Sequence, residues 1–273
     1  MKNILIPVDF SEVSWNALHC ALCFFENVAI QFYIIHVNTH TNGHNVDDGD
    51  LEIHKNIAIH TRFKEWLKIS NKQITAHHKI SSLERKGSFI KTLREVVTEK
   101  NIDLIVLGTQ QSNVFEDSVI GSYTREVITR VKCPALVVPQ DTPCPVPKEM
   151  ALLTDFNFKH NSKALKVISD MVTIGNAHLT ILNLLKKNGL VSIDQKENKQ
   201  FLKEAFLNLD HSFHFVVNQT MDEALQFFID VQQVDLVILF AKNMNFSEHL
   251  LFSPSTDTTI NYHKKTPFLI VHE

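Results

Sequence analysis

Two glycines and a serine in the first half of the chain could together hold a phosphate group. Gly108 ends the apolar run Leu104–Leu107, and Gly121 and Ser122 directly precede a segment with helical spacing. Glycine has no Cβ atom to keep an anion away from backbone N–H groups, and the dipole at a helix start favours negative charge. The sequence therefore predicts an anion-binding loop between a strand and a helix. Alternatively, the glycines only end the strand and begin the helix.

A carboxylate stands at a second position suited to a ligand. Asp9 follows the apolar strand pattern at residues 4–8. In a doubly wound sheet, ligands bind at the edge formed by the carboxyl ends of the strands. We therefore expect Asp9 to face the same edge as Gly108 and Gly121. Asp9 can equally order the turn or cap the next helix, for which Ser11 is also suited.

The segments that position these residues alternate between strand and helix patterns. Strands are predicted from short apolar or alternating segments at 4–8, 30–37, 74–80, 104–107 and 133–139. Helices are predicted from apolar residues spaced three and four apart at 12–26, 50–70, 88–100 and 123–131. The strand at 74–80 alternates and includes His77 and His78, which is typical of a sheet edge. This alternation predicts an α/β fold, a parallel sheet with helices on both faces.

The second half of the sequence repeats the first. The stretch from Ala151 to Phe156 matches that from Leu5 to Phe10, and the stretch from Asp235 to Leu239 matches that from Asp103 to Leu107. A proline-rich joint at residues 144–147 separates the copies. The repeat predicts two tandem domains of one fold.

The order and spacing of these segments resemble the universal stress protein family, to which UspA belongs. Its nucleotide binders carry Gly, two residues, Gly, nine residues and then Gly-Ser or Gly-Thr at this point. Here those positions read Gly108, Gln111, Gly121 and Ser122. Gln111 departs from the pattern, because a side chain stands where the nucleotide binders have none.

The resemblance implies more about fold and site. It implies two doubly wound, Rossmann-like domains of the adenine nucleotide alpha hydrolase type, at 1–140 and 148–273. It also implies that Asp9 approaches a ribose and that the backbone of Val37 meets an adenine. Family members pair at the last strand of the sheet, so we expect an internal pseudo-dimer through the strands that end in Val138 and Val271. A further homodimer stays open.

The loop of the second copy differs from that of the first. Residues 240–255 contain no glycine, and Pro254 lacks an N–H donor. We therefore expect no nucleotide in the second half. The apolar residues of this loop are interpreted as local core packing or, alternatively, as a partner-facing surface; they are Phe240, Phe246, Leu250, Leu251 and Phe252.

Composition and charge argue against several other classes. A formal net charge of −3 and a pI near 6.6 argue against a nucleic-acid partner. No apolar run is long enough to span a membrane and no signal peptide precedes the first strand, so we expect a cytoplasmic protein.

The cysteines and histidines suggest neither a disulfide framework nor a metal site. Cys20 and Cys23 lie inside a helical pattern and are interpreted as small core residues, because four cysteines are too few for a framework. No spacing among the acidic and histidine residues of 40–48 fixes a rigid ligand set, so no metal site is predicted.

Three functions follow from these residues. The leading hypothesis is a stress-response protein that binds ATP or another adenine nucleotide, with Mg²⁺ if the phosphates need it, in the first domain only. Arg125 is the nearest cation for a phosphate. The alternative is a nucleotide-free scaffold for protein partners, which Gln111 and the second loop favour. An enzyme is not expected, because no nucleophile and base are positioned by spacing, so no catalytic residue is predicted.

Overall fold

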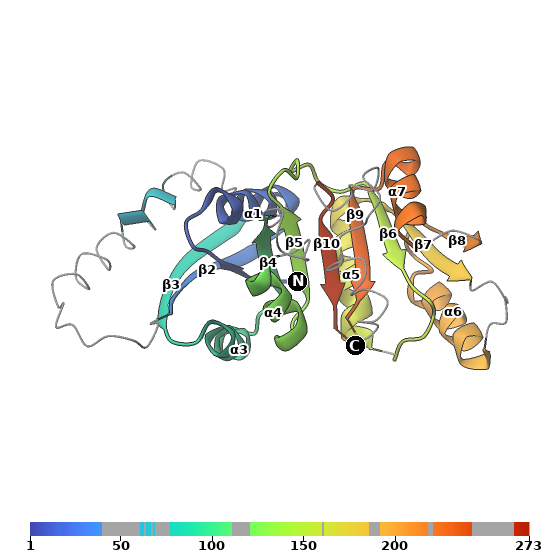
Figure 1. Ribbon diagram of the computed structural model, residues 1–273, viewed down its shortest axis with the longest axis horizontal. Helices are drawn as coiled ribbons and strands as arrows, with labels where there is room; N and C mark the ends of the chain where they lie inside the picture. The colour runs from blue at the N-terminus through green and yellow to red at the C-terminus, as the bar shows by residue number, and fades with distance from the viewer. Residues whose placement is uncertain are drawn as a thin grey trace.

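A single sheet runs through the whole molecule. The computed structural model describes residues 1–39, 61–62, 64–66, 68, 77–110, 121–159, 161–185, 192–217, 221–241 and 265–272. Ten strands form the sheet in the order β3-β2-β1-β4-β5-β10-β9-β6-β7-β8. Figure 1 shows β5 and β10 side by side at the middle of the molecule.

The first half contains five strands, which pair in parallel. Its elements are β1 (Asn3–Pro7), α1 (Glu12–Phe24), β2 (Ile30–Asn38), β3 (His78–Lys86), α3 (Phe89–Glu99), β4 (Leu104–Thr109), α4 (Ser122–Arg130) and β5 (Ala135–Pro139). The side chain of Ser11 caps α1 by accepting a hydrogen bond from the Ser14 N–H. Leu18 and Leu22 of this helix are buried in the core, and each such side chain stabilises the fold by about 1.5–3 kcal/mol.

The second half repeats this arrangement. Its elements are β6 (Glu149–Leu153), α5 (Ser162–Gly175), β7 (His178–Leu185), α6 (Ile193–Ala205), β8 (His211–Val217), α7 (Met221–Gln232), β9 (Leu236–Phe240) and β10 (Phe268–Val271). The repeat extends to single backbone conformations. Phe10 and Phe156 follow the matching aspartates, and both have a left-handed φ, of 64° and 59°. The predicted tandem α/β fold is therefore confirmed.

The two halves join through β5 and β10. These strands are antiparallel, with Phe268 opposite Val137 and Ile270 opposite Ala135, whereas the other strand pairs are parallel. The predicted internal pairing is confirmed. A core cluster on one face of the sheet includes Leu18 from α1, Ile168 from α5 and Leu202 from α6, so the apolar packing continues across the junction.

The third strand differs from its prediction. β3 is the sheet edge, as expected, but it occupies His78–Lys86 rather than 74–80. Its second part, from Ser81 to Lys86, is polar and resembles a loop in sequence. A polar strand is stable here because it pairs with β2 on one side only and its charged residues face solvent. The helix predicted at 50–70 lies largely outside the described residues.

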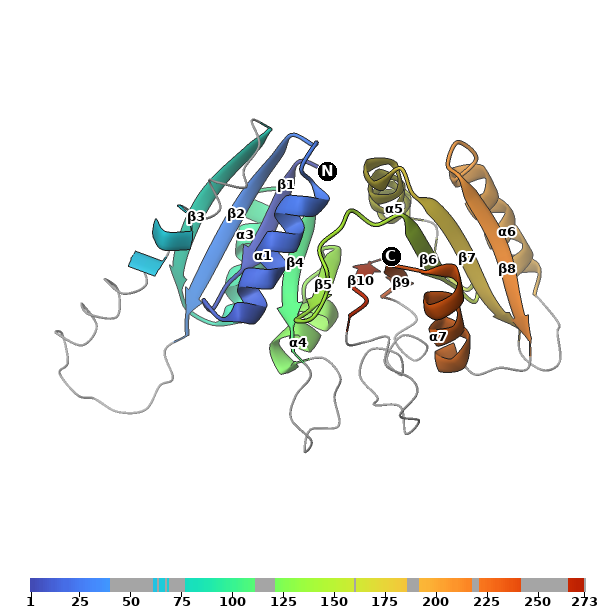
Figure 2. The ribbon, with the colours of Figure 1, turned by 90° about the horizontal axis from the view of Figure 1, so that it is seen from above.

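Cys20 is a core residue, as predicted, and Cys23 is only half-buried, but the sequence did not predict a disulfide. Cys20 is buried in α1, but it forms a disulfide with Cys144 of the segment between the halves, with a sulfur–sulfur distance of 2.06 Å. This segment passes along α1, where the Asn16 side chain donates hydrogen bonds to the carbonyl oxygens of Pro139 (3.1 Å) and Gln140 (3.0 Å). Figure 2 shows the connection from β5 to β6 crossing the middle of the molecule. The pairing escaped the sequence because 124 positions separate the two cysteines.

Candidate functional site

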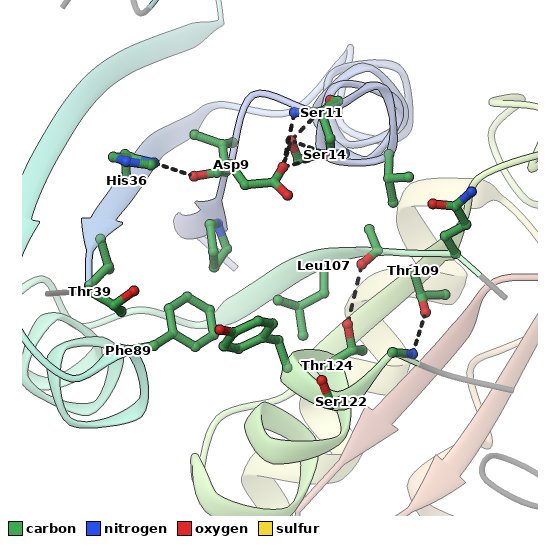
Figure 3. Close-up of a pocket in the computed structure, with 18 residues that line it drawn as sticks. Asp9, Ser11, Ser14, His36, Thr39, Phe89, Leu107, Thr109, Ser122 and Thr124 are labelled. Carbon is green, nitrogen blue, oxygen red and sulfur yellow. Dashed lines mark hydrogen bonds between the residues drawn. The ribbon is translucent and has the colours of Figure 1, made fainter. Parts of the chain in front are cut away.

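A pocket of about 590 Å³ lies at the carboxyl edge of the first half-sheet. Its walls come from the ends of β1, β2 and β4 and from the starts of α1, α3 and α4. Five of the six residues predicted to bind a nucleotide line it: Asp9, Val37, Gly108, Gly121 and Ser122. Figure 3 shows Asp9 on one side and Ser122 on the opposite side. The sixth residue, Gln111, lies outside the described residues.

Hydrogen bonds from the start of α1 hold the Asp9 carboxylate. Its Oδ1 accepts bonds from the Ser11 N–H (3.0 Å), the Ser11 hydroxyl (2.6 Å) and the Ser14 hydroxyl (2.7 Å). Burial alone would raise the pKa of Asp9, but these hydrogen bonds outweigh it and lower the pKa below its ordinary value. Asp9 thus orders the turn into α1, as the alternative interpretation expected. Its Oδ2 accepts no hydrogen bond from the described residues, so this oxygen can accept one from a ligand hydroxyl.

The two glycines of the loop have different roles. A Cβ atom on Gly108 would lie 2.5 Å from the carbonyl oxygen of Val13, so this glycine is needed for α1 to pack against β4. A Cβ atom on Gly121 would meet no described residue within 4 Å. The backbone of Gly121, with φ −55° and ψ 149°, is also open to other residues. Space for a ligand therefore exists at Gly121, whereas Gly108 is explained by packing.

The start of α4 presents hydrogen-bond donors to the pocket. The Gly121 N–H donates to the Thr109 hydroxyl (3.3 Å), and the Thr124 hydroxyl donates to the Gly108 carbonyl oxygen (3.3 Å), which ties α4 to the end of β4. The first N–H groups of a helix have no acceptor within that helix. Those of Ser122, Tyr123 and Thr124 belong to residues that line the pocket. They can therefore bind an anion.

Three aromatic residues that the site prediction did not include also line the pocket. Phe89 begins α3 and packs edge to face against Tyr123 of α4, with ring centroids 5.4 Å apart. Tyr123 is 64% exposed, so much of its ring is available. His36, near the end of β2, donates a hydrogen bond from Nδ1 to the Val8 carbonyl oxygen (2.8 Å). The position of Tyr123 directly after Gly121 and Ser122 was a signal that could have identified it.

The cation expected near a phosphate is not in the pocket wall. Arg125 is exposed and lies outside the set of residues that line the pocket. It lies three residues after Ser122 on a neighbouring part of the helix surface, but it does not itself line the pocket. Arg125 is thus a poor candidate for the phosphate contact that the sequence suggested.

In the second half, aromatic packing occupies the turn that follows the matching aspartate, Asp155. Asn198 donates hydrogen bonds to the carbonyl oxygens of Phe156 (2.8 Å) and Phe158 (3.0 Å), which fixes the turn after β6. The ring of Phe158 then stacks on Phe240 at the end of β9, with centroids 4.9 Å apart and an angle of 11°. Both rings are buried, so aromatic packing takes the place of a ligand surface. Most of the loop predicted to lack nucleotide, residues 242–255, lies outside the described residues.

Within the part of the chain that the structure describes, no group of three or more His, Cys, Asp or Glu residues could hold a metal ion. The candidates His40, His44, Asp47 and Asp48 are outside that part. None of the described helices is both long enough and apolar enough to cross a lipid bilayer.

A parallel sheet with a pocket at the carboxyl ends of its strands is typical of doubly wound α/β proteins, whose ligands bind at that edge. The sequence model of the Universal stress protein family matches residues 1–139. The chain belongs to this family.

Solved structures share the tandem architecture. A universal stress protein from Archaeoglobus fulgidus aligns over 99% of this chain and 98% of its own, with a TM-score of 0.66 and 14% identity. A universal stress protein homologue from Pseudomonas aeruginosa UCBPP-PA14 aligns over 100% and 93%, with a TM-score of 0.57 and 10% identity. At these identities the similarity shows the fold alone. A comparison with curated proteins found no match.

Proposed function

We propose that this universal stress protein binds an adenine nucleotide in its first half, as a stress-response protein of the cytoplasm. One observation carries the proposal: three separate parts of the sequence, Asp9, Val37 and the pair Gly121–Ser122, line one pocket of about 590 Å³. That volume is within the usual range for small-molecule sites. The preference for adenine rests on the family resemblance at Val37.

The pocket offers a separate contact for each part of a nucleotide. The base would lie near Val37 and the rings of Phe89 and Tyr123, where apolar and aromatic surface favours stacking. A ribose hydroxyl would donate to Oδ2 of Asp9. A phosphate would accept hydrogen bonds from the N–H groups and the Ser122 hydroxyl at the start of α4. If ATP is the ligand, Mg²⁺ would enter with its phosphates.

The proposal is that the pocket binds a nucleotide without hydrolysing it. The low pKa of Asp9 makes it a weak base, and its Oδ1 is already engaged by two serine hydroxyls. Both serine hydroxyls donate hydrogen bonds to Asp9, which gives them a structural role at the start of α1. The second half, closed by Phe158 and Phe240, would serve as the structural partner of the first.

Calorimetric titration of nucleotide-free protein with AMP and with Mg²⁺-ATP tests the proposal. We expect one site per chain and loss of binding in Gly121→Asp, because the new carboxylate fills open space at the phosphate position and repels the anion. Asp155→Asn, at the position of the second half that matches Asp9, is the control outside the pocket, and it should bind like the wild type. No binding of either nucleotide, or equal loss in both variants, would overturn the proposal.

A nucleotide-free scaffold is the second candidate. The packing of Phe158 on Phe240 favours it, because one half of the chain already keeps the fold with aromatic side chains in place of a ligand. Absence of binding in the titration, with the fold intact by circular dichroism, would favour this candidate.

A further inference from the structure

A chain of hydrogen-bonded polar side chains lies at the outer edge of the second half-sheet. The register of β7 and β8 places Thr180 opposite Ser212, so His178, two residues before Thr180, lies on the same face of the sheet as Ser212. Nδ1 of His178 is 3.1 Å from a carboxylate oxygen of Asp210. Its Nε2 is 2.8 Å from the hydroxyl oxygen of Ser212. Carboxylate, imidazole and hydroxyl in this order form the arrangement that activates a serine as a nucleophile.

The partners in this chain determine which atoms donate protons. A carboxylate only accepts, so Nδ1 of His178 carries a proton and Nε2 is left as an acceptor. The Ser212 hydroxyl therefore donates to Nε2 of His178. Nε2 of His214 is 3.1 Å from the same hydroxyl oxygen and is the donor in that contact, because the serine proton is already engaged. Ser212 Oγ thus lies between a base that can take its proton and an N–H that can stabilise negative charge.

The serine can be reached from solvent. Ser212 and His178 are half-buried, His214 is exposed, and β8 is the outermost strand of the sheet on this side (Figure 1). The sequence did not predict the cluster, because His178 comes from the neighbouring strand, 34 positions before Ser212. Only the pairing of β7 with β8 brings the two side chains together.

Exposed apolar side chains of α7 lie beside the cluster. The ring of His214 packs edge to face against Phe228 of α7, with centroids 5.5 Å apart. Phe227 directly precedes Phe228 and Val231 follows one turn later, and these two side chains are 50% and 57% exposed. Figure 2 shows α7 on the face of the sheet opposite to α6, in agreement with the separate core clusters around Phe228 and Leu202. Apolar surface next to a nucleophile suits the acyl part of an ester.

We propose that the second half contains a serine hydrolase site that cleaves small esters with an apolar acyl group. Ser212 is the nucleophile, His178 is the general base, and Asp210 is a positioning residue that orients His178. This activity goes beyond the proposed function, because nucleotide binding concerns the other half of the chain.

The reaction follows from the contacts of Ser212. Its Oγ attacks the carbonyl carbon of the ester while its proton passes to Nε2 of His178. The ester C–O bond breaks, and His178 gives this proton to the departing alkoxide. A water molecule then gives a proton to the same imidazole and attacks the acyl-serine, which releases the acid, and Ser212 takes the proton back. The N–H of His214 donates to the carbonyl oxygen while that oxygen carries negative charge.

Labelling of the full-length protein with a fluorophosphonate tests the nucleophile. The reagent forms a bond between phosphorus and the oxygen of an activated serine and loses fluoride. Peptide mass spectrometry should show Ser212 labelled at least about tenfold faster than Ser82, an exposed serine of the opposite edge strand β3. His178→Gln should slow the labelling of Ser212 at least about tenfold. Equal labelling of Ser212 and Ser82, or no effect of His178→Gln, would overturn the proposal.

Hydrolysis of p-nitrophenyl acetate tests turnover. Ser212→Ala should remove the enzymatic rate, with the fold intact by circular dichroism. Asp210→Asn should lower kcat about tenfold and leave KM unchanged, and Asp210→Glu should restore part of the rate, because this carboxylate acts through His178. Gly121→Asp, in the pocket of the first half, is the control and should hydrolyse the ester like the wild type. A rate that Ser212→Ala leaves unchanged would assign hydrolysis to other groups and contradict the proposal.

The length of the acyl chain tests the apolar surface. Phe227→Ser should lower kcat/KM for p-nitrophenyl butyrate about three- to fivefold and leave that for the acetate unchanged, because the two further CH₂ groups lose apolar contact. Equal losses for both esters would show that α7 does not bind the acyl group.

Discussion

Gly108 and the carbonyl oxygen of Val13 are so close that a Cβ atom on the glycine would lie 2.5 Å from the oxygen. This contact joins the end of β4 to the first turn of α1. The backbone of one element thus packs directly on the backbone of the other. Gly108 is therefore required by the fold at the point where the pocket opens, whether or not a ligand binds.

Alanine at the two loop glycines should separate packing from binding. We expect Gly108→Ala to lower the free energy of unfolding by about 1–3 kcal/mol, because backbone must shift to accept the methyl group. Gly121→Ala should change it by less than about 0.5 kcal/mol, because its methyl group meets open space. Urea denaturation followed by circular dichroism measures both. Equal destabilisation by the two substitutions would contradict the assigned roles.

The Asp9 hydrogen bonds predict a pH dependence of stability. Its pKa is lowered in the folded protein, so its contribution is fully present above the unfolded pKa and is lost as the pH falls through the folded value. The stability difference between wild type and Asp9→Asn should be constant from about pH 7 to 5 and should shrink below about pH 4. Thermal unfolding across this range measures it.

Ser14→Ala is the control for that pH dependence. Ser14→Ala removes one hydrogen bond to Asp9 Oδ1. In protein that carries Ser14→Ala, the effect of Asp9→Asn on stability should therefore depend less on pH. A difference between wild type and Asp9→Asn that stays unchanged down to pH 3 would mean that the carboxylate is not specially stabilised.

The disulfide predicts a count of reactive thiols. In denaturant, protein purified without reductant should show two reactive thiols before reduction and four after it, because Cys23 and Cys133 are free and Cys20 is paired with Cys144. In the native state Cys133 should react slowly, because burial raises the pKa of its thiol to about 12.

Breaking the disulfide should lower stability. Cys144→Ser should reduce the free energy of unfolding by about 2–4 kcal/mol, because the bond closes a long loop in the unfolded chain. Cys23→Ser should be nearly neutral by comparison. Four reactive thiols before reduction, or equal stability of both variants, would show that the bond does not form.

Much of the fold could be predicted because local and repeated patterns agree. The apolar run before Gly108 and its copy before Phe240 predicted β4 and β9. The internal repeat predicted that the second half has the same fold as the first. The bounds of the edge strand β3 were harder to predict from the sequence, because residues 81–86 are mostly polar and form a strand only through pairing with β2. The partner of Cys20 depends on the path of the chain between the halves, which no local pattern encodes.

The candidate site was predictable in part for the same reason. Asp9, Gly121 and Ser122 follow strands or begin helices, so their place at the sheet edge follows from topology. The packing role of Gly108 depends on how closely α1 approaches β4, which the sequence does not reveal. The wall residues Phe89 and Tyr123 meet only when α3 and α4 are brought side by side.

Photolabelling with 8-azidoadenosine 5′-monophosphate would test nucleotide binding by the first half most directly. After irradiation and proteolysis, mass spectrometry locates the labelled peptides. We predict labelling within residues 1–139, competed by unlabelled AMP and lost in Gly121→Asp. Competed labelling within residues 148–273 instead, or labelling that survives Gly121→Asp unchanged, would contradict a nucleotide site at this pocket.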